Sequence, residues 1–212
     1  SGKGDLIKVS DKKLGRDATM ELIGKVFSLG TIFLSRTGFS ISLEDLDVSD
    51  LVKDKNHKVI DVAEKKAQKI IESYYDKSLE LIPGLSAEET RETKVLQILN
   101  GVRTDVGQNV KVGFSKDSMA SKMITSGAKG SILNISQIAG SVGQQVLNGG
   151  RIDFGYTGRT LSFFKKGDLS PSAGGFIYSS FMKGMSPQEF FFGSMTGRDG
   201  LMDTALRTPK SG

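Results

Sequence analysis

The stretch GMSPQEFFFGSMTGRDGLMDTALRTPKSG, residues 184–212, contains a clear signal for the start of a helix. Ser186 is a favourable N-cap residue, and Pro187 suits the first helical position because an N–H there would have no helical partner. Glu189 follows three residues after the serine and completes a capping box. We therefore predict that a helix begins at Ser186 and runs through most of this stretch.

The helix predicted after Ser186 contains residues that weaken helices. A glycine costs about 1 kcal/mol relative to alanine inside a helix, and this helix has Gly193, Gly197 and Gly200. Such a helix favours either the close approach of another surface or a bend. Pro209, near its end, would remove one helical hydrogen bond and favour a kink.

Two more helices are predicted to form a long antiparallel hairpin. The first covers residues 51–82 and has an apolar stripe along one face. Pro83-Gly84 is a turn, and Ser86 with Glu89 forms a capping box that opens the second helix. The stripe of the second helix covers residues 95–106. Two amphipathic helices joined by a short turn pack antiparallel, and narrow stripes indicate a hairpin that projects into solvent.

The other predicted elements are short, which makes the chain mainly α with small β elements. Strands are expected at residues 6–9 and 39–43, and an extended segment at 151–161. Shorter helices are expected from Asp17 to about Thr37, and at residues 115–126, 131–147 and 176–182.

Composition limits the class of protein. The 212 residues suffice for one or two domains. A net charge of +5 and a pI of about 9.3 are compatible with nucleic acid or nucleotide phosphates as partners, although many basic proteins bind neither. The absence of cysteine excludes disulfides and cysteine-ligated zinc within these residues. The most apolar window, residues 20–34, is shorter than the roughly 20 residues that span a bilayer, so no membrane partner is predicted.

An acidic run and the single histidine are weak candidates for a metal or catalytic site. The run comprises Glu44, Asp45, Asp47 and Asp50. It lacks the spacing and the glycine of a calcium loop, so a solvated loop that caps the next helix is favoured. His57 has no second histidine or cysteine to complete a zinc site or a catalytic triad. We predict no metal site.

Lysines and a glycine-rich stretch are candidates for binding phosphate. One face of the first hairpin helix carries Lys53, Lys55, Lys58, Lys65, Lys66, Lys69 and Lys77. This face is either a surface for a partner or an ordinary solvated face, and the second is the default. Residues 127–131, GAKGS, are superficially similar to a phosphate loop. The Walker spacing is incomplete and a predicted helix precedes the stretch, so a turn between helices is favoured.

The C-terminal stretch resembles the start of the bridge helix in the largest subunit of cellular multisubunit DNA-directed RNA polymerases, of the archaeal and eukaryotic nuclear type. Several long motifs in the same order are far more specific than a single glycine pattern. They are SGAKGS at 126–131, NISQ at 134–137, VGQQ at 142–145, GRI…FG…RTL at 150–161, PQEFFF at 187–192 and GRDGLMDTALRT at 197–208.

The resemblance implies a fragment of a larger multidomain subunit. Residues 1–48 correspond to the end of the pore domain, and residues 49–160 to the funnel domain, whose helical hairpin lines the secondary channel for nucleotide entry. Residues 161–212 correspond to the start of the cleft and bridge-helix region. The implied partners are the other polymerase subunits, the DNA template and RNA, nucleoside triphosphates, and transcript-cleavage or elongation factors at the funnel. The implied location is the cytoplasm of an archaeon or the nucleus of a eukaryote.

The resemblance also implies residues that line the nucleotide path. Lys129 matches a lysine near the nucleotide entry site, where its charge can attract a triphosphate. Asn100 and Arg103 on the second hairpin helix, together with Gln144 and Gln145, match positions that face the channel or the cleft under the bridge helix. In eukaryotic relatives that cleft binds a cyclic peptide toxin. The alternative for the two glutamines is amide hydrogen bonding that fixes neighbouring elements.

Six residues of the bridge-like helix are candidates for functional contacts: Arg198, Asp199, Asp203, Arg207, Thr208 and Pro209. A buried network among the first three would fix the position of the helix. The last three match the part that lies against the template strand. A cation there meets phosphate, and a small side chain lets a base pair lie close.

The sequence departs from the family at a few of these positions. Gly193 replaces the usual histidine after FFF, and Thr196 stands where a glycine is common. Ser162-Phe163 replaces a Pro-His pair, and Pro209 replaces alanine or serine. These differences affect which inhibitor and other contacts can be carried over from the family, and they leave the family resemblance intact.

The residues that would carry out catalysis are absent. Nucleotidyl transfer needs two metal ions held by clustered carboxylates, and the aspartate loop of the family, NADFDGD, does not occur in this sequence. We therefore predict no catalytic residue and no bound cofactor in this fragment. The resemblance assigns Mg²⁺ and the nucleotidyltransferase activity to the whole polymerase, and the isolated fragment is expected to be inactive.

Two other classes of function remain open from the residues alone. A free-standing helical-hairpin module that binds protein or nucleic acid would have a polar C-terminal end, yet the sequence stops within a predicted helix. A small nucleotide-binding enzyme built on residues 127–131 would need a preceding strand and a pair of carboxylates, which are not predicted.

Overall fold

The computed structural model describes residues 4–153, 155 and 157–212, which divide into two compact units. One unit comprises residues 1–46 and 115–130, and the other comprises residues 47–114 and 131–212. The structure is 62% helical with small two-stranded sheets, which confirms the mainly α class. Phe154 of the FG pair in the motif GRI…FG…RTL lies outside the described residues.

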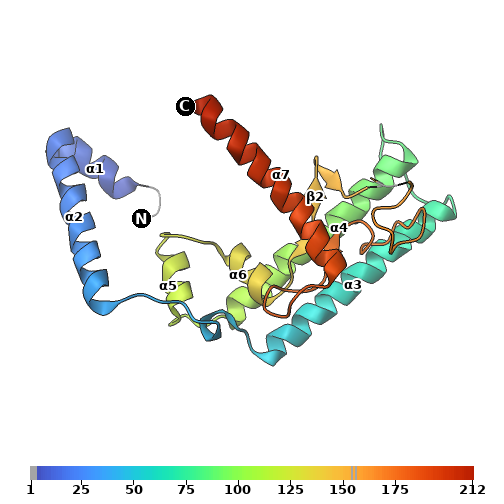
Figure 1. Cartoon of the computed structure of the whole chain (residues 1–212), viewed down its shortest axis with the longest axis horizontal. Coiled ribbons are helices and arrows are strands. Elements are labelled where there is room, and N and C mark those ends of the chain that lie inside the picture. Colours follow the sequence, from blue (N-terminus) through green and yellow to red (C-terminus); the bar gives the residue numbers. More distant parts are fainter. Residues whose placement is uncertain (1–3, 154, 156) are drawn as a thin grey trace. The chain divides into compact units, whose positions relative to one another are not determined.

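Helices α3 (Asp50–Tyr75) and α4 (Ala87–Gly113) form the predicted antiparallel hairpin in the larger unit (Figure 1). The hairpin does not project freely into solvent as predicted, because α4 also packs against elements between residues 132 and 151. The predicted capping box is present at the start of α4. The Ser86 hydroxyl accepts the Glu89 N–H at 3.2 Å, and the Glu89 carboxylate accepts the Ser86 backbone N–H at 2.8 Å. The buried seam contains Ala63, Ala67, Ile71, Val95, Leu99, Val102, Val106 and Val110.

Helix α3 ends at Tyr75 and not near Ile82, as was predicted. Lys77 adopts the left-handed backbone conformation, with φ of 56°. Its N–H donates to the Tyr74 carbonyl at 3.2 Å, and the Ser78 N–H donates to the Ser73 carbonyl at 2.9 Å. This pair of bonds is a Schellman motif, in which glycine usually occupies the left-handed position.

We expect Lys77→Gly to stabilise the chain. The left-handed conformation costs an L-residue about 1–2 kcal/mol, while glycine loses about 0.5–1 kcal/mol more backbone entropy on folding. The net gain in the free energy of unfolding should be about 0.5–1 kcal/mol, measured by urea denaturation followed by circular dichroism. As a control, Lys65→Gly on the exposed face of α3 should cost about 1 kcal/mol. A loss of stability in Lys77→Gly would contradict this assignment.

The helix predicted at residues 131–147 is correct only in its first half. Helix α6 (Ile132–Ala139) packs against α4 and is followed by Gly140. A Cβ atom on this glycine would lie 2.5 Å from Val106 Cγ1 and 2.8 Å from the Ser136 carbonyl oxygen. Only glycine allows the chain to pass this close to α4.

Short strands follow α6 instead of further helix. Strands β1 (Gly143–Gln144) and β4 (Phe176–Ile177) pair antiparallel, and so do β2 (Val146–Leu147) and β3 (Gly150–Arg151). The helix predicted at residues 176–182 is therefore wrong, because this segment begins as β4. Of the extended segment predicted at 151–161, Arg151 belongs to β3 and Arg159 forms an isolated bridge, while the other described residues are turns, bends or irregular. Residues 154 and 156 lie outside the described residues.

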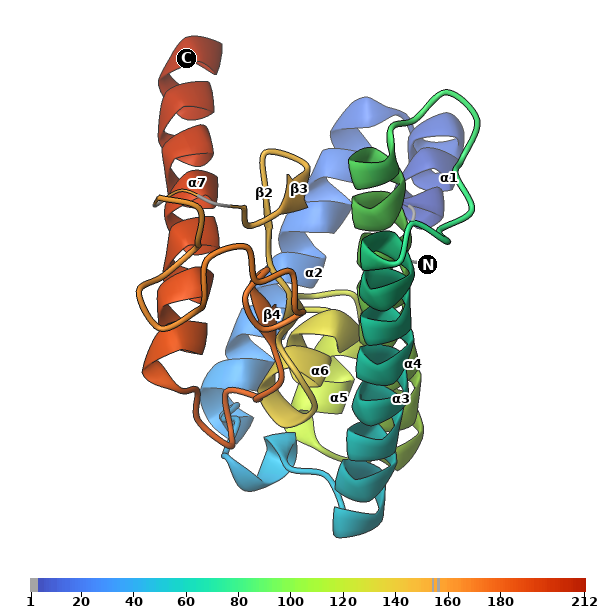
Figure 2. The same cartoon turned by 90° about the vertical axis from the view of Figure 1, so that its right-hand side faces the viewer.

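Helix α7 (Pro187–Ser211) begins where the capping box predicted and continues through Pro209. Figure 2 shows its first turns beside the segment that carries β4. Phe192 is the buried residue of α7, and its ring stacks on Phe164 with centroids 6.1 Å apart. Among the described residues, no atom lies within 4 Å of a Cβ built on Gly197 or Gly200, so the close approach predicted for these glycines does not occur within the chain.

The smaller unit is also helical. Helices α1 (Asp5–Leu14) and α2 (Arg16–Thr37) pack on each other, so the strand predicted at residues 6–9 is wrong and the helix from Asp17 is confirmed. A 3₁₀ turn, η1 (Glu44–Leu46), follows a segment at 39–43 that is not a strand. The predicted helix at 115–126 is present in a shorter form as α5 (Met119–Thr125).

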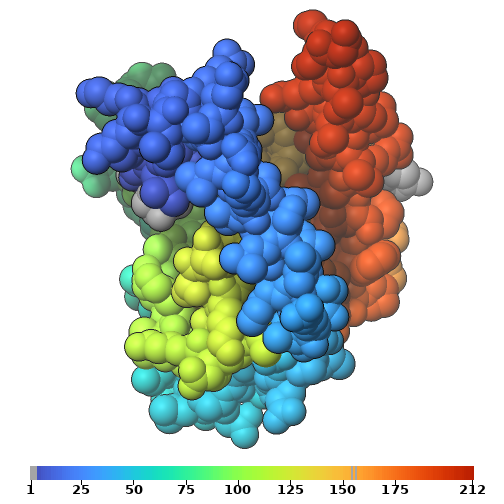
Figure 3. Space-filling model, turned by 90° about the vertical axis from the view of Figure 1, so that its left-hand side faces the viewer, coloured from blue at the N-terminus to red at the C-terminus, as the bar shows by residue number. Residues whose placement is uncertain are grey.

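Helix α2 carries many apolar side chains, and they are largely exposed (Figure 3, blue). Its 22 residues are enough to cross a membrane by length and composition, although the apolar window considered from sequence was shorter. Only 6% of its most apolar window is buried. Helices that another protein surface covers have the same composition, so this feature alone does not establish contact with a membrane.

Candidate functional site

The start of α7 is attached to the end of β4 by one carboxylate. Glu189 accepts the backbone N–H groups of Tyr178 at 2.9 Å and Ser179 at 3.1 Å with one oxygen. Its other oxygen accepts the Ser186 N–H at 2.9 Å and completes the capping box. Glu189 therefore caps its own helix and also joins that helix to a distant strand.

The electrostatics of Glu189 favour the charged form. Burial alone would raise the pKa of this carboxyl group, but the backbone N–H groups of Ser186 and Ser179 outweigh it and lower the pKa below its ordinary value of 4.5. Because the pKa is lowered in the folded state, the stabilisation is present above pH 4.5. It is lost as the pH falls through the lower folded-state pKa.

We expect Glu189→Gln to lower the free energy of unfolding by about 1 kcal/mol at pH 7, because a neutral amide is a weaker acceptor than a carboxylate. The difference between the wild type and the variant should shrink as the pH falls below 4.5. Urea unfolding at several pH values measures both quantities. Asp199→Asn, which alters an exposed carboxylate of the same helix, should change stability by less than about 0.5 kcal/mol. A difference that grows in acid would contradict this linkage.

A buried ion pair joins α4 to the segment that contains β3. Arg151 donates to Glu92 at 2.9 Å and 3.0 Å, and its side chain is only 4% exposed. It also donates to the carbonyl of Leu169 at 3.2 Å. A Cβ atom on Gly174 would collide with the Arg151 guanidinium, so a glycine is needed there. Burial opposes ionisation of Glu92, but Arg151 and then Arg91 lower the pKa of this carboxyl group overall.

Removing the charge of Glu92 should be costly, because it leaves Arg151 buried without a counter-ion. We expect Glu92→Gln to lower the free energy of unfolding by about 2 kcal/mol. This is less than the roughly 3–5 kcal/mol typical of fully buried pairs, because the Glu92 side chain is 37% exposed. Glu88→Gln, at an exposed position of the same helix, is the control and should have little effect. Equal losses in the two variants, measured by urea denaturation, would show that the pair is not responsible.

The two glutamines of VGQQ are buried and bonded within the chain. Gln144 donates to the carbonyls of Gln145 and Gly174, both at 2.7 Å. Gln145 donates to the Gly143 carbonyl at 3.2 Å. The side-chain amide oxygen of Gln144 has no hydrogen-bond partner among the described residues. These bonds fix the loop around β1, which is the alternative considered for these residues from sequence.

A groove of about 350 Å³ lies between the first turns of α7 and the segment from α6 to β1. Gln145 lines it, so one of the two glutamines predicted to face the channel or cleft borders a hollow beside the bridge-like helix. Gly193, which departs from the family histidine, lines the same groove and leaves one wall without a side chain. The other lining residues include Gln137, Val142, Phe181, Met185, Phe190 and Thr196.

The remaining predicted residues are exposed and are not gathered into one site. Asn100 and Arg103 lie on the exposed face of α4. Lys129 is exposed in the turn after α5. That turn is a helix end and not a phosphate loop, because the Ala128 N–H donates to the Met123 carbonyl at 3.2 Å in a Schellman motif with Gly127 in the left-handed conformation.

The six candidate residues on α7 are all exposed. The buried network of Arg198, Asp199 and Asp203 that was considered from sequence does not form within the described residues. The observed pair is instead Arg207 with Asp203, at 2.7 Å across one helical turn. This pair is exposed, so it contributes little to stability.

The acidic run is occupied by local contacts. Asp45 accepts the Ser42 backbone N–H at 2.9 Å, and Asp47 pairs with Lys53 at 3.1 Å. Among the residues that the structure describes, no group of three or more histidine, cysteine, aspartate or glutamate side chains could hold a metal ion.

Three residues important to the geometry were not singled out from sequence as contacts between elements. Glu92 and Arg151 are far apart in the chain, and nothing local marks them as partners. The second role of Glu189, in binding the end of β4, could not be read from the sequence either. The capping role alone is enough to explain a glutamate at this position. The one available signal was the position of Arg151 within the GRI motif.

Comparisons with known proteins give a consistent result. Residues 71–177 match the family described as RNA polymerase Rpb1, domain 4, and residues 184–212 match RNA polymerase Rpb1, domain 5. The chain is 42% identical over 209 residues to DNA-directed RNA polymerase subunit Rpo1N of Halococcus morrhuae. The aligned region covers 99% of this chain and 60% of that protein.

Two other relatives carry the same name and are longer. The identity is 41% over 208 residues with the subunit of Halobacterium salinarum, covering 98% of this chain and 21% of that protein. It is 40% over 202 residues with the subunit of Methanothermobacter thermautotrophicus, covering 95% of this chain and 23% of that protein. The chain therefore spans 60% or less of the length of these relatives.

Proposed function

Since the chain belongs to the RNA polymerase Rpb1 family of largest subunits, we propose that it forms part of the nucleotide path and the start of the bridge helix in a DNA-directed RNA polymerase. The observation that carries this proposal is α7. It matches Rpb1 domain 5, is fixed at its first turns and is exposed from residue 197 onward. A helix with this exposure has its side chains available for partners outside the chain.

The division of labour follows the family. Residues 1–48 form the end of the pore domain, residues 49–160 the funnel domain and residues 161–212 the start of the cleft and bridge-helix region. The α3–α4 hairpin lines the secondary channel, with Asn100 and Arg103 facing it. Their exposure supports this role, because residues that line a channel cannot be buried in the core.

Two groups of residues act on different ligands in this proposal. Lys129 attracts the triphosphate of the incoming nucleotide as a point charge, and its exposure at a helix end leaves the ammonium group accessible. Arg207 and Thr208 help to position the template strand, and Pro209 shapes the helix beside them. The groove beside α7, which Gln145 lines, is the cleft in which an inhibitor of the polymerase would bind.

The partners in this proposal are the remaining polymerase subunits, template DNA and RNA, nucleoside triphosphates and factors that dock at the funnel. The exposed apolar side chains of α2 support burial against other parts of the polymerase, in place of a membrane. The named relatives belong to archaea, which supports a cytoplasmic location.

Catalysis belongs to the assembled polymerase and not to this chain alone. The described residues provide no carboxylate cluster for Mg²⁺, so the metal ions would be held by other parts of the subunit. What this chain supplies is orientation and charge along the path of the substrate. We accordingly expect the isolated chain to show no template-dependent RNA synthesis.

Lys129→Ala in a reconstituted polymerase tests the nucleotide path. Losing a partly screened charge contact of about 1 kcal/mol should raise the apparent KM for nucleotide roughly fivefold. The rate at saturating nucleotide should change little, because the charge acts on binding. Single-nucleotide addition kinetics measures both parameters, and Lys129→Arg should retain most of the wild-type behaviour.

Arg207→Ala is the matched comparison, because its proposed partner is nucleic acid. This variant should slow addition at saturating nucleotide while leaving the apparent KM nearly unchanged. An unaltered nucleotide dependence in Lys129→Ala would refute the role of Lys129 in attracting the triphosphate. Lys129 would then be only a residue of the turn at the end of α5.

A further inference from the structure

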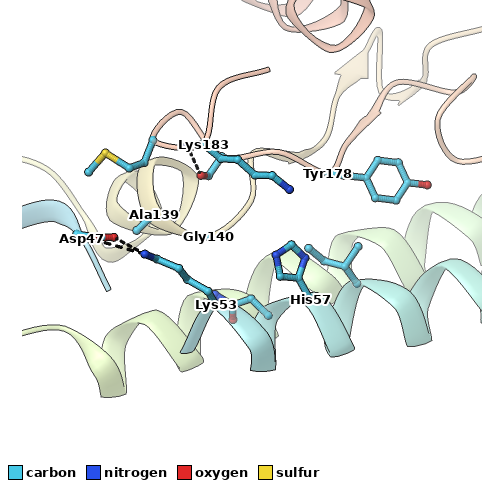
Figure 4. A pocket seen from close by; sticks show the side chains of 11 residues that line it. Asp47, Lys53, His57, Ala139, Gly140, Tyr178 and Lys183 are labelled. Atoms are coloured by element: carbon cyan, nitrogen blue, oxygen red, sulfur yellow. Dashed lines mark hydrogen bonds and ion pairs between the residues drawn. The ribbon is translucent and has the colours of Figure 1, made fainter. Parts of the chain in front are cut away.

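A second pocket, separate from the groove beside α7, lies at the base of the hairpin in the larger unit (Figure 4). Its volume is about 280 Å³, and it is formed by α3, the end of α6 and the segment after β4. None of its lining residues is assigned a role in the proposed function. The polar lining residues are Asp47, Lys53, Asn56, His57, Tyr178, Ser180 and Lys183.

Two basic side chains face each other across this pocket. Figure 4 shows the Lys183 side chain extending from one wall toward the His57 ring on α3. Lys183 makes no ion pair with any described residue, whereas Lys53 is paired with Asp47 at 3.1 Å and with Asp50 at 3.3 Å. Lys183 is exposed, and its charge is not neutralised by any residue that the structure describes.

The acidic groups near the pocket already have partners. Asp47 is the one carboxylate among the described lining residues, and its hydrogen bond from Lys53 holds the pKa of this carboxyl group below the usual range. Glu64 accepts a hydrogen bond from the Tyr178 hydroxyl at 2.8 Å. Burial, helped by this hydrogen bond, raises the pKa of Tyr178, so the hydroxyl stays protonated as a donor to Glu64. No other carboxylate among the described lining residues competes for Lys183.

Asn56 adds an unsatisfied donor. This residue is 3% exposed, and its carbonyl oxygen accepts the Asn109 amide at 3.1 Å. Its own amide nitrogen is buried without a hydrogen-bond partner among the described residues. Buried donors in proteins are usually paired, and Asn56 is one of the lining residues, so an acceptor in the pocket that reached this nitrogen would satisfy it.

We propose that this pocket binds an oxyanion, a phosphate or a carboxylate group, between Lys183 and His57 and close to the unpaired Asn56 amide. The remaining walls are apolar and include Ile60, Ala139 and Met182. These walls suit a short nonpolar group to which the phosphate or carboxylate is attached. The volume is at the lower end for ligand pockets, which favours a small anion over a whole nucleoside triphosphate.

The single histidine provides a direct test. His57 is the only histidine of the 212-residue chain, so its imidazole C–H signals in a ¹H–¹³C correlation spectrum are unique. The chain is titrated at constant pH and constant ionic strength with sodium phosphate in one series and sodium acetate in another, with sodium chloride as the reference salt. We expect a saturable shift of the His57 signals with at least one of the two oxyanions and none with chloride.

Charge variants connect that shift to the pocket. Lys183→Gln should weaken the apparent affinity about fivefold, the loss expected for one partly screened charge contact. Lys183→Arg should stay within about twofold of the wild type because it keeps the charge. Lys65→Gln, an exposed lysine of α3 outside the pocket, is the matched control and should not change the affinity. The amide signals of each sample verify that the variant is folded.

The outcomes separate the sources of the anion. Saturation by phosphate alone supports a phosphate-bearing ligand, and saturation by both salts supports a site that also accepts carboxylates, such as an acidic side chain. The proposal is overturned if neither salt produces a saturable shift, or if Lys183→Gln binds as tightly as the wild type. Because Lys129 and Arg207 take no part in this test, its failure leaves the proposed role in transcription unaffected.

Discussion

The structure of the larger unit depends on the apolar row along α4. Val95, Val106 and Val110 are fully buried, and Leu99 and Val102 are 1% and 2% exposed. Burying a valine or leucine side chain is worth about 1.5–3 kcal/mol, so this row alone holds α4 firmly in place. One side of α4 packs on α3 and the other supports α6, β1 and β3. The Arg151–Glu92 pair joins β3 to α4, and Gln144 donates its hydrogen bonds from β1, a strand that also packs against α4.

Signals that act within a few residues were readable from the sequence. Both capping boxes, at Ser86 and Ser186, place helix starts where the structure has them, because the serine and the glutamate of each box bond to adjacent backbone. The GAKGS turn is likewise a helix end, because Gly127 supplies the left-handed residue that a Schellman motif requires. The long apolar stripes were sufficient to predict the hairpin.

Features that depend on distant residues or on unusual backbone were not predictable. Lys77 ends α3 in a conformation that lysine rarely adopts, so nothing marked that end. Gly140 stops α6 against Val106, a contact that exists only in the folded chain. Arg151 and Glu92 are separated by 59 positions, and their pairing follows from the packing of β3 on α4. The segment at 6–9 was too short for its apolar residues to distinguish a strand from a helix.

Helix α7 is fixed at its N-terminal end, and its C-terminal end has no support from the residues that the structure describes. Glu189 and Phe192 form the clamp, and the exposed part from residue 197 to Ser211 is about 22 Å long at about 1.5 Å per residue. A tilt of about 7° at Phe192, about 28 Å from Ser211, would displace the free end by about 3.5 Å, close to the roughly 3.4 Å step between stacked bases. Small rearrangements around the groove at the base of α7 would thus be magnified, at the far end, to the scale of one nucleotide.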